Sequence, residues 1–242
     1  MDGAYDVAAV ASAGPPPEDY IVAPANGPVG GLTAAEVTSI VEKAISTANT
    51  IRAMIRLPIG QRAKFVIAVA DLDGKIIALN RMPDATVFSI DVAVAKARNL
   101  VYFASSGVDP QDLPGVPAGT AVTNRTISFG AQPLFPPGID GSGPGPFFEL
   151  YKYDTANPCT NGHQAANPNQ SGIVFFPGSV PLYKNGVLVG ALGISGDGVE
   201  QDDYDSGQAY VGFEPAANIM ADQVLINGVR LPYLKYPRNP TF

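Results

Sequence analysis

Apolar residues recur at helical spacing in residues 33–51, on the side that would face a core. Thr33 followed by Glu36 forms a capping-box pattern, which predicts that the helix begins just after Thr33. The same periodicity returns in residues 89–105, where Ser89 is the candidate N-cap and small residues favour close packing on a sheet. The sequence therefore predicts two amphipathic helices in its first half.

Two pairs of apolar runs surround short turn signals, and each pair predicts a β-hairpin. Residues 65–70 and 75–80 lie on either side of Asp73-Gly74, and residues 172–183 and 187–195 lie on either side of Asn185-Gly186. Asp-Gly and Asn-Gly accept the positive φ values of tight hairpin turns. The acidic segment GDGVEQDD follows the second hairpin and indicates the start of a third helix, and a fourth is expected after Pro215.

Two segments lack any periodicity. Residues 1–31 are rich in Pro, Gly and Ala and are predicted to be an extended arm, which leaves residues 32–242 as the domain. Residues 107–171 form a long, turn-rich insert, in which residues 120–130 are expected to supply one short strand. The order of elements predicts an α+β fold, an antiparallel sheet flanked by helices.

Composition narrows the functional classes. The 242-residue chain has 15 Lys and Arg against 22 Asp and Glu, a net charge of −7, so the clustered basic residues that nucleic acid needs are missing. It has no apolar run long enough to span a membrane, and its single cysteine, Cys159, excludes an intrachain disulfide. The low content of charged residues favours a periplasmic or extracellular protein, while the lack of a basic leader at the start leaves the cytoplasm open.

Four segments carry a family resemblance: LTAAEV, AVADLDGKIIALNRM, SIDVAVAKA and FPGSVPLYKNGVLVGALGISGDGVEQDD. Together they resemble the GlcG/HbpS family over about residues 32–106 and 172–210. This resemblance implies a profilin-like fold, assembly into homo-oligomers such as dimers or rings, and, in some members, binding of haem or a related tetrapyrrole. The sequence departs from the family at Ser179, where a second glycine is usual, and in the length of its insert.

Candidate binding residues lie in the resembling segments. We predict that Arg81, Ser89, Lys96, Val180 and Pro181 contribute to a cofactor site for haem, with the two cations meeting carboxylates of the ligand. The alternative is that Arg81 and Lys96 pair with Asp71, Asp91 or a neighbouring subunit. His163 is the only histidine, and its polar loop favours a solvated side chain over an axial iron ligand.

Other motifs have structural interpretations. The acidic residues of DLDG and DGVEQDD could ligate Ca²⁺, but they lack EF-hand spacing, so roles in turns and at a helix start are favoured. GALGISG follows a hairpin rather than opening a βαβ unit, so its glycines indicate close backbone packing rather than a dinucleotide site. We assign no catalytic and no metal-ligating residue.

Three functional hypotheses remain. The first is a non-enzymatic, oligomeric protein that binds haem or another tetrapyrrole, and it rests mainly on the resemblance. The second is an assembly module of an extracellular or cell-surface complex, driven by the arm and the neutral insert. The third is an enzyme that uses Arg81, Lys96 and nearby aspartates on a small acidic metabolite.

Overall fold

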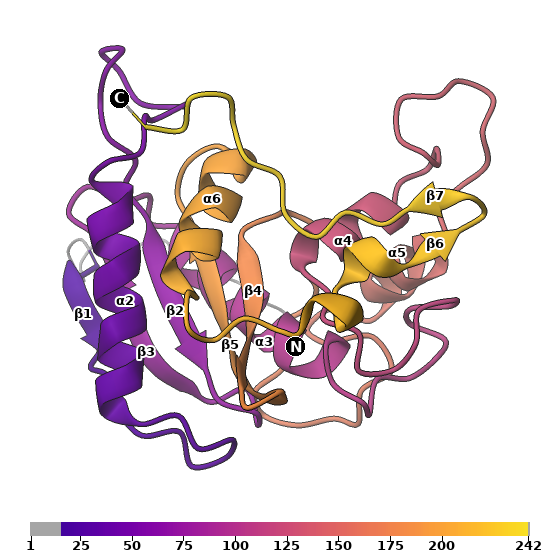
Figure 1. The fold of residues 1–242 in the computed structure, drawn as a ribbon, viewed down its shortest axis with the longest axis horizontal. Coiled ribbons are helices and arrows are strands. Elements are labelled where there is room, and N and C mark those ends of the chain that lie inside the picture. The colour runs from indigo at the N-terminus through magenta and orange to yellow at the C-terminus, as the bar shows by residue number, and fades with distance from the viewer. Residues whose placement is uncertain (1–15, 242) are drawn as a thin grey trace, which may run out of the picture.

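A computed structural model describes residues 16–241 and shows an α+β fold built on one five-stranded antiparallel sheet. The strands lie in the order β1-β3-β2-β5-β4 (Figure 1). Their bounds are β1 Asp19–Val22, β2 Val66–Ala70, β3 Ile76–Arg81, β4 Ser179–Lys184 and β5 Val187–Ser195. The predicted fold class is confirmed.

Helices cover both faces of this sheet. α2 (Ala34–Ala48) and α6 (Val199–Ala209) pack against each other and lie in front of the sheet in Figure 1, and α3 (Ser89–Phe103) packs behind it on β2, β4 and β5. Central strand β2 is therefore buried along its whole length. Gly193 of β5 shows how closely α3 approaches, because a Cβ there would lie 2.2 Å from the carbonyl oxygen of Ala93. Close packing, as the sequence predicts, is the role of this glycine.

The local signals at both hairpins and at the first helix are confirmed. Thr33 and Glu36 form both halves of the capping box at the start of α2. Gly74 has a positive φ in the β2–β3 turn, and Asn185 and Gly186 both have positive φ in the β4–β5 turn. The acidic segment lies where expected, in the first turns of α6.

Three local predictions are wrong. Residues 120–130 contain helix α4 (Asn124–Gly130) instead of a strand, because Thr123 and Thr126 form a capping box. Two short 3-10 helices (Ala217–Ile219 and Ala221–Gln223) and the hairpin β6 (Leu225–Ile226) and β7 (Val229–Arg230) replace the helix expected after Pro215. Ser89 is the first residue of α3 and not its N-cap, since Phe88 holds that position without a side-chain hydrogen bond.

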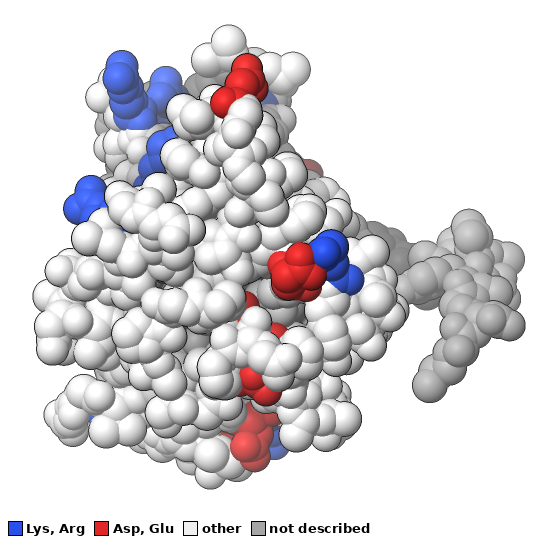
Figure 2. Space-filling model, turned by 90° about the vertical axis from the view of Figure 1, so that its right-hand side faces the viewer, with Lys and Arg blue, Asp and Glu red and all other residues white. Residues whose placement is uncertain are grey.

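The insert and the C-terminal tail build the other half of the molecule. α4, helix α5 (Phe148–Ala156) and the β6–β7 hairpin lie together on the right of Figure 1, beside the sheet rather than on it. Figure 2 looks onto this side and shows a surface of mostly uncharged residues with a few scattered charges. The face of the molecule formed by the insert and the tail is thus mostly uncharged.

Part of the N-terminal arm joins the sheet. β1 pairs with β3 as an edge strand, a position that tolerates the prolines around it. Residues 1–15 of the predicted arm lie outside the described residues, and the division into arm and domain stays a prediction. Within residues 16–241, no helix is long and apolar enough to cross a membrane.

Candidate functional site

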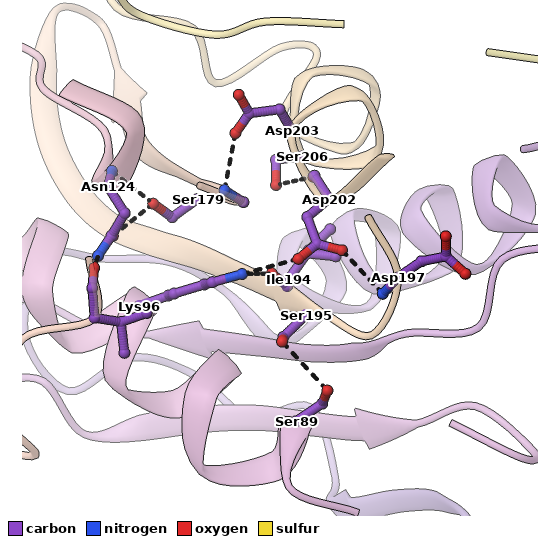
Figure 3. Close-up of polar contacts among 12 residues, drawn as sticks. Ser89, Lys96, Asn124, Ser179, Ile194, Ser195, Asp197, Asp202, Asp203 and Ser206 are labelled. Carbon is purple, nitrogen blue, oxygen red and sulfur yellow. Dashed lines mark hydrogen bonds and ion pairs between the residues drawn. The ribbon is translucent and has the colours of Figure 1, made fainter. Parts of the chain in front are cut away.

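Lys96 is a charged residue in the middle of a buried cluster. It projects from α3, its residue surface is 1% exposed, and its Nζ donates to the carbonyl of Ile194 at 2.6 Å and to Asp202 Oδ2 at 3.0 Å (Figure 3). The partner is an α6 aspartate, so neither Asp71 nor Asp91, the alternatives raised by the sequence, pairs with Lys96. The side chain therefore links α3 to α6.

A glycine makes room for this link. Gly178 precedes β4 with a φ of 111°, and a Cβ there would lie 2.7 Å from Lys96 Nζ and 2.6 Å from Asp202 Cβ. Any larger residue would clash with both members of the ion pair and strain the backbone. The retained glycine of the FPGS segment is thus explained by the passage of Lys96.

The insert is tied into the same cluster. Ser179 Oγ donates to Asn124 Oδ1 at 2.7 Å and accepts from the Asn124 backbone N at 3.1 Å. Arg125, the next residue, forms an ion pair through Nε with Asp203 of α6. The sequence departs from the GlcG/HbpS pattern at Ser179 and in the length of its insert. These two departures contact each other, because Ser179 is hydrogen-bonded to Asn124 of the insert.

Two serines lie at the end of the cluster nearest the start of α3. Ser195 Oγ donates to Ser89 Oγ at 3.3 Å (Figure 3). Ser89 Oγ also lies 2.6 Å from Thr86 Oγ1 in a second hydrogen bond. We call the whole set the polar core, and its members are Ser89, Lys96, Asn124, Ser179, Ser195, Asp202 and Asp203.

Burial governs the titration of the aspartates in and beside the polar core. It raises the pKa of Asp202 to about 6, although the Lys96 ammonium acts in the opposite direction. Burial likewise raises the pKa of Asp203, against the effect of Arg125. Asp205, three residues after Asp202 in α6, has a pKa well above its usual value because it is buried beside Asp202. Burial in the polar core therefore disfavours the charged forms of its own aspartates.

The remaining predicted binding residues are also enclosed. Arg81 donates from Nε and Nη2 to the carbonyl of Ala85 at 2.9 and 2.7 Å, and its Nη1 lies 3.6 Å from Glu18. Val180 and Pro181 are buried in β4, which two other strands separate from the strand that carries Arg81. The structure thus brings Ser89 and Lys96 into one cluster but does not bring Arg81, Val180 and Pro181 to it.

A large cavity lies elsewhere, and His163 is on its wall. It measures about 920 Å³ and is bounded by the end of α3, residues 104–110 and 163–165, and the β4–β5 turn. Apolar side chains on its wall include Leu72, Val101, Val108, Val187 and Leu188, and none of the lining residues is Lys or Arg. None of the five predicted binding residues lies on this wall.

A buried carboxylate holds His163 in place. Asp112 is completely buried, and its Oδ1 lies 2.6 Å from His163 Nδ1 while its Oδ2 accepts from the backbone N of His163 at 3.0 Å. Tyr102 Oη donates to the same Oδ2 at 2.6 Å, and the His163 ring stacks on Tyr153 at 3.9 Å between centroids. The histidine is therefore only partly solvated, as 30% of its side chain is exposed, and Asp112 fixes its orientation.

The sequence offers no signal for most of these partners. Asp112 lies in a turn-rich stretch with no motif, and Asn124 and Arg125 lie in the segment predicted as a strand. Asp71 does have the predicted turn role, since its Oδ1 accepts from the backbone N of Asp73 and Lys75. Within residues 16–241, no group of three or more His, Cys, Asp or Glu residues is arranged to hold a metal ion.

Comparison with known proteins places most of the chain in one family. The family model described as haem degrading protein HbpS-like matches residues 32–204. No curated protein matches the chain. The match ends before the C-terminal tail, which includes both 3-10 helices and the β6–β7 hairpin.

Several solved structures are similar at low identity. A PduOC:haem complex is 22% identical, with 76% of this chain and 96% of that chain covered and a TM-score of 0.49. The protein ORFY of Klebsiella pneumoniae is 19% identical, with 74% and 88% covered and a TM-score of 0.48. A double mutant of HbpS from Streptomyces reticuli is 17% identical, with 75% and 84% covered and a TM-score of 0.42.

Proposed function

The chain belongs to the HbpS-like haem-degrading protein family, and on that premise we propose that it binds haem in the 920 Å³ cavity, with His163 as the iron ligand. One observation carries this proposal: the only histidine of the chain lies on the cavity wall with Nδ1 engaged by Asp112. A histidine held in this way presents Nε2, and metal-ligating histidines characteristically have such a carboxylate on the other nitrogen. The residues present therefore fit a haem iron.

Other potential ligands on the wall are poorer. Burial raises the pKa of the Tyr183 phenol to about 12, and burial together with Asp112 raises the pKa of Tyr102 further. Both phenols remain protonated at neutral pH, and iron binds tyrosine as the phenolate. His163 is thus the better candidate for the iron ligand on this wall.

The rest of the cavity suits a flat apolar molecule. A volume of this order holds a cofactor of drug size or larger, and the apolar wall supplies surface for a porphyrin. Since the lining has no Lys or Arg, the propionates would point to solvent. This arrangement differs from the sequence-based prediction, in which Arg81 and Lys96 meet those carboxylates.

A haemin titration followed by Soret absorbance tests the proposal. The background is Cys159→Ser, because the exposed thiol of Cys159 could bind iron on its own. We expect saturation near one haem per chain, loss of the Soret shift in His163→Ala, and about 10- to 100-fold weaker binding in Asp112→Asn. Gln164→Ala changes the same wall without removing a ligand and serves as the matched control.

The titration also separates the two candidate sites. Binding that survives His163→Ala but is lost in Arg81→Ala or Lys96→Ala would place haem at the residues predicted from sequence. The absence of any saturable shift in the parent protein would remove haem as the ligand.

Binding without turnover is the role we propose for this site. The polar atoms of Tyr102 and Asp112 are hydrogen-bonded to each other and to His163. These three residues therefore offer a ligand one atom, His163 Nε2. Loss of the Soret band on addition of ascorbate in air, faster than for free haemin, would contradict this part of the proposal.

Self-association is a second role, favoured by a separate surface. Met54, Ile55, Leu57 and Ile59 are 57 to 92% exposed, and Arg56 holds their loop to the one carrying Val87 and Phe88 through an ion pair with Asp84 at 2.6 Å. Exposed apolar surface of this extent typically marks an interface. Light scattering should show an oligomer that Leu57→Ser with Ile59→Ser dissociates and that Tyr151→Ser, an exposed residue elsewhere, leaves intact.

A further inference from the structure

A second cavity, of about 660 Å³, lies between α4 and the C-terminal tail. It shares no lining residue with the His163 cavity. Arg125 and Phe129 of α4 form one wall, and all its other lining residues lie in 210–236, beyond the segment that the family model matches. The cavity is therefore a feature of this chain's own tail rather than of the matched family region.

The frame of this cavity is fixed by hydrogen bonds to the tail backbone. Thr123 Oγ1 donates to the carbonyl of Tyr233 at 2.6 Å, and Thr126 Oγ1 donates to the carbonyl of Pro232 at 2.7 Å. The backbone N of Lys235 donates to Asp203 Oδ2 at 3.0 Å. Buried hydrogen bonds of this kind hold the tail against α4, so the cavity is preformed and a ligand need not order it.

Two guanidinium groups on the wall have unused donors. Arg125 uses Nε on Asp203, while its buried Nη2 has no hydrogen-bond partner among the described residues. Arg230 is exposed and, within residues 16–241, forms no side-chain hydrogen bond or ion pair. Asp222 is the acidic residue on the lining, and its Oδ1 accepts from Gln223 instead of pairing with either arginine. Arg230 thus has free donors suited to an anion, and Arg125 adds positive charge to the same wall.

The other walls are mostly aromatic and apolar, and the remaining cation on the lining, Lys235, pairs through Nζ with Glu200 at 2.7 Å. Phe129, Tyr210, Tyr233 and Tyr236 line the cavity. Burial raises the pKa of Tyr210 to about 12, and it raises the pKa values of Tyr233 and Tyr236 as well. These phenols stay neutral at physiological pH, so they offer ring surface without repelling a negative ligand.

We propose that this cavity is a binding site for a small aromatic carboxylate. The planar guanidiniums of Arg125 and Arg230 match the geometry of a carboxylate, and the phenylalanine and tyrosine rings provide a surface for an aromatic ring. A few polar groups on an otherwise apolar, aromatic wall are the usual composition of a small-molecule site.

Calorimetric titration of the full chain with benzoate tests this site, with benzamide as the uncharged probe of the same shape. We expect saturable benzoate binding and binding of benzamide at least about tenfold weaker, because it lacks the charge that the arginines recognise. Binding of both probes with equal affinity, or no saturable binding of benzoate, would overturn the proposal.

Two arginine variants locate the binding. Arg230→Gln should weaken benzoate about tenfold, because it removes a charge-assisted contact from a residue with no structural partner. Arg238→Gln makes the same change in charge on an exposed residue of the same tail that does not line the cavity, and benzoate should bind it as tightly as the parent. His163→Ala should also leave benzoate binding unchanged. Equal weakening by both arginine variants would show non-specific attraction and overturn the assignment.

Discussion

The polar core and the His163 cavity both hold charged side chains away from water, but they use them differently. In the polar core, Lys96 donates to a carbonyl and to Asp202, and it is 1% exposed. At the cavity, Asp112 is equally buried, but it holds a histidine that is 30% exposed and keeps one ring nitrogen uncommitted. The charged groups of the polar core bond to partners inside the protein, whereas at the cavity Nε2 of His163 is left for a ligand.

This difference assigns the polar core to the stability of the fold and the His163 cavity to ligand binding. A buried ion pair with complete partners joins elements, here α3 to α6, and removing one partner leaves a charge without compensation. A buried carboxylate behind an open side chain instead orients that side chain. We therefore expect substitutions in the polar core to affect folding first and substitutions at the cavity to affect ligand binding first.

Lys96→Met should have the largest effect on stability. It leaves Asp202 buried without its cation, and the free energy of unfolding at pH 8 should fall by about 3–5 kcal/mol, measured by urea denaturation. The loss should be smaller at pH 5, where Asp202 can take up a proton. The double variant Lys96→Met with Asp202→Leu should recover part of the loss, since neither charge is then buried alone.

A different outcome would reverse the comparison. If Lys96→Met unfolds at the same urea concentration as the parent but no longer binds haemin, then Lys96 is a binding residue, as the sequence resemblance implies. The polar core would then be the functional site and the His163 cavity a structural one.

The pH dependence of the free energy of unfolding should show the cost of burying the Asp202 carboxylate in the polar core. Asp202 has a pKa of about 6 in the folded chain against a usual 3.8, so between these values the folded state holds a proton that the unfolded chain releases. The contribution of Asp202 to stability therefore falls as pH rises from about 4 to about 6 and is constant above that range.

Asp202→Asn provides the reference, because its amide does not titrate. From pH 4 to pH 7, the parent should lose roughly 2–3 kcal/mol of unfolding free energy relative to Asp202→Asn. The opposite slope would mean that Lys96, and not burial, dominates the pKa of Asp202, and that the ion pair is relaxed rather than strained.

The sequence predicted one of these two regions much better than the other. The sheet, α2, α3 and the start of α6 follow from apolar periodicity and two turn dipeptides, signals that are local. Ser89 and Lys96 were recognised because they lie in the segments that resemble a family. Their long-range partners, Asp202 and Ser195, come from a distant part of the chain, so no local pattern could pair them.

The cavity could not be predicted from the sequence for a physical reason. Asp112 and His163 are 51 residues apart in a turn-rich insert, and only the folded insert brings them together. His163 looked solvated because its sequence neighbours are polar, yet the carboxylate that fixes it is not among them. The same holds for residues 120–130, where a Thr-x-x-Thr capping box outweighed apolar residues that suggest a strand.

His163→Ala should have the smallest effect on stability of the changes considered. The side chain is partly exposed, and Asp112 keeps its hydrogen bonds from Tyr102 and from the backbone of residue 163. Urea denaturation should therefore show a loss below about 1 kcal/mol, typical of a single hydrogen bond outside the core. A loss of about 3 kcal/mol or more, on the scale of a buried ion pair, would mean that the Asp112–His163 pair supports the fold as the polar core does. In that case, loss of haemin binding in this variant would no longer identify a ligand.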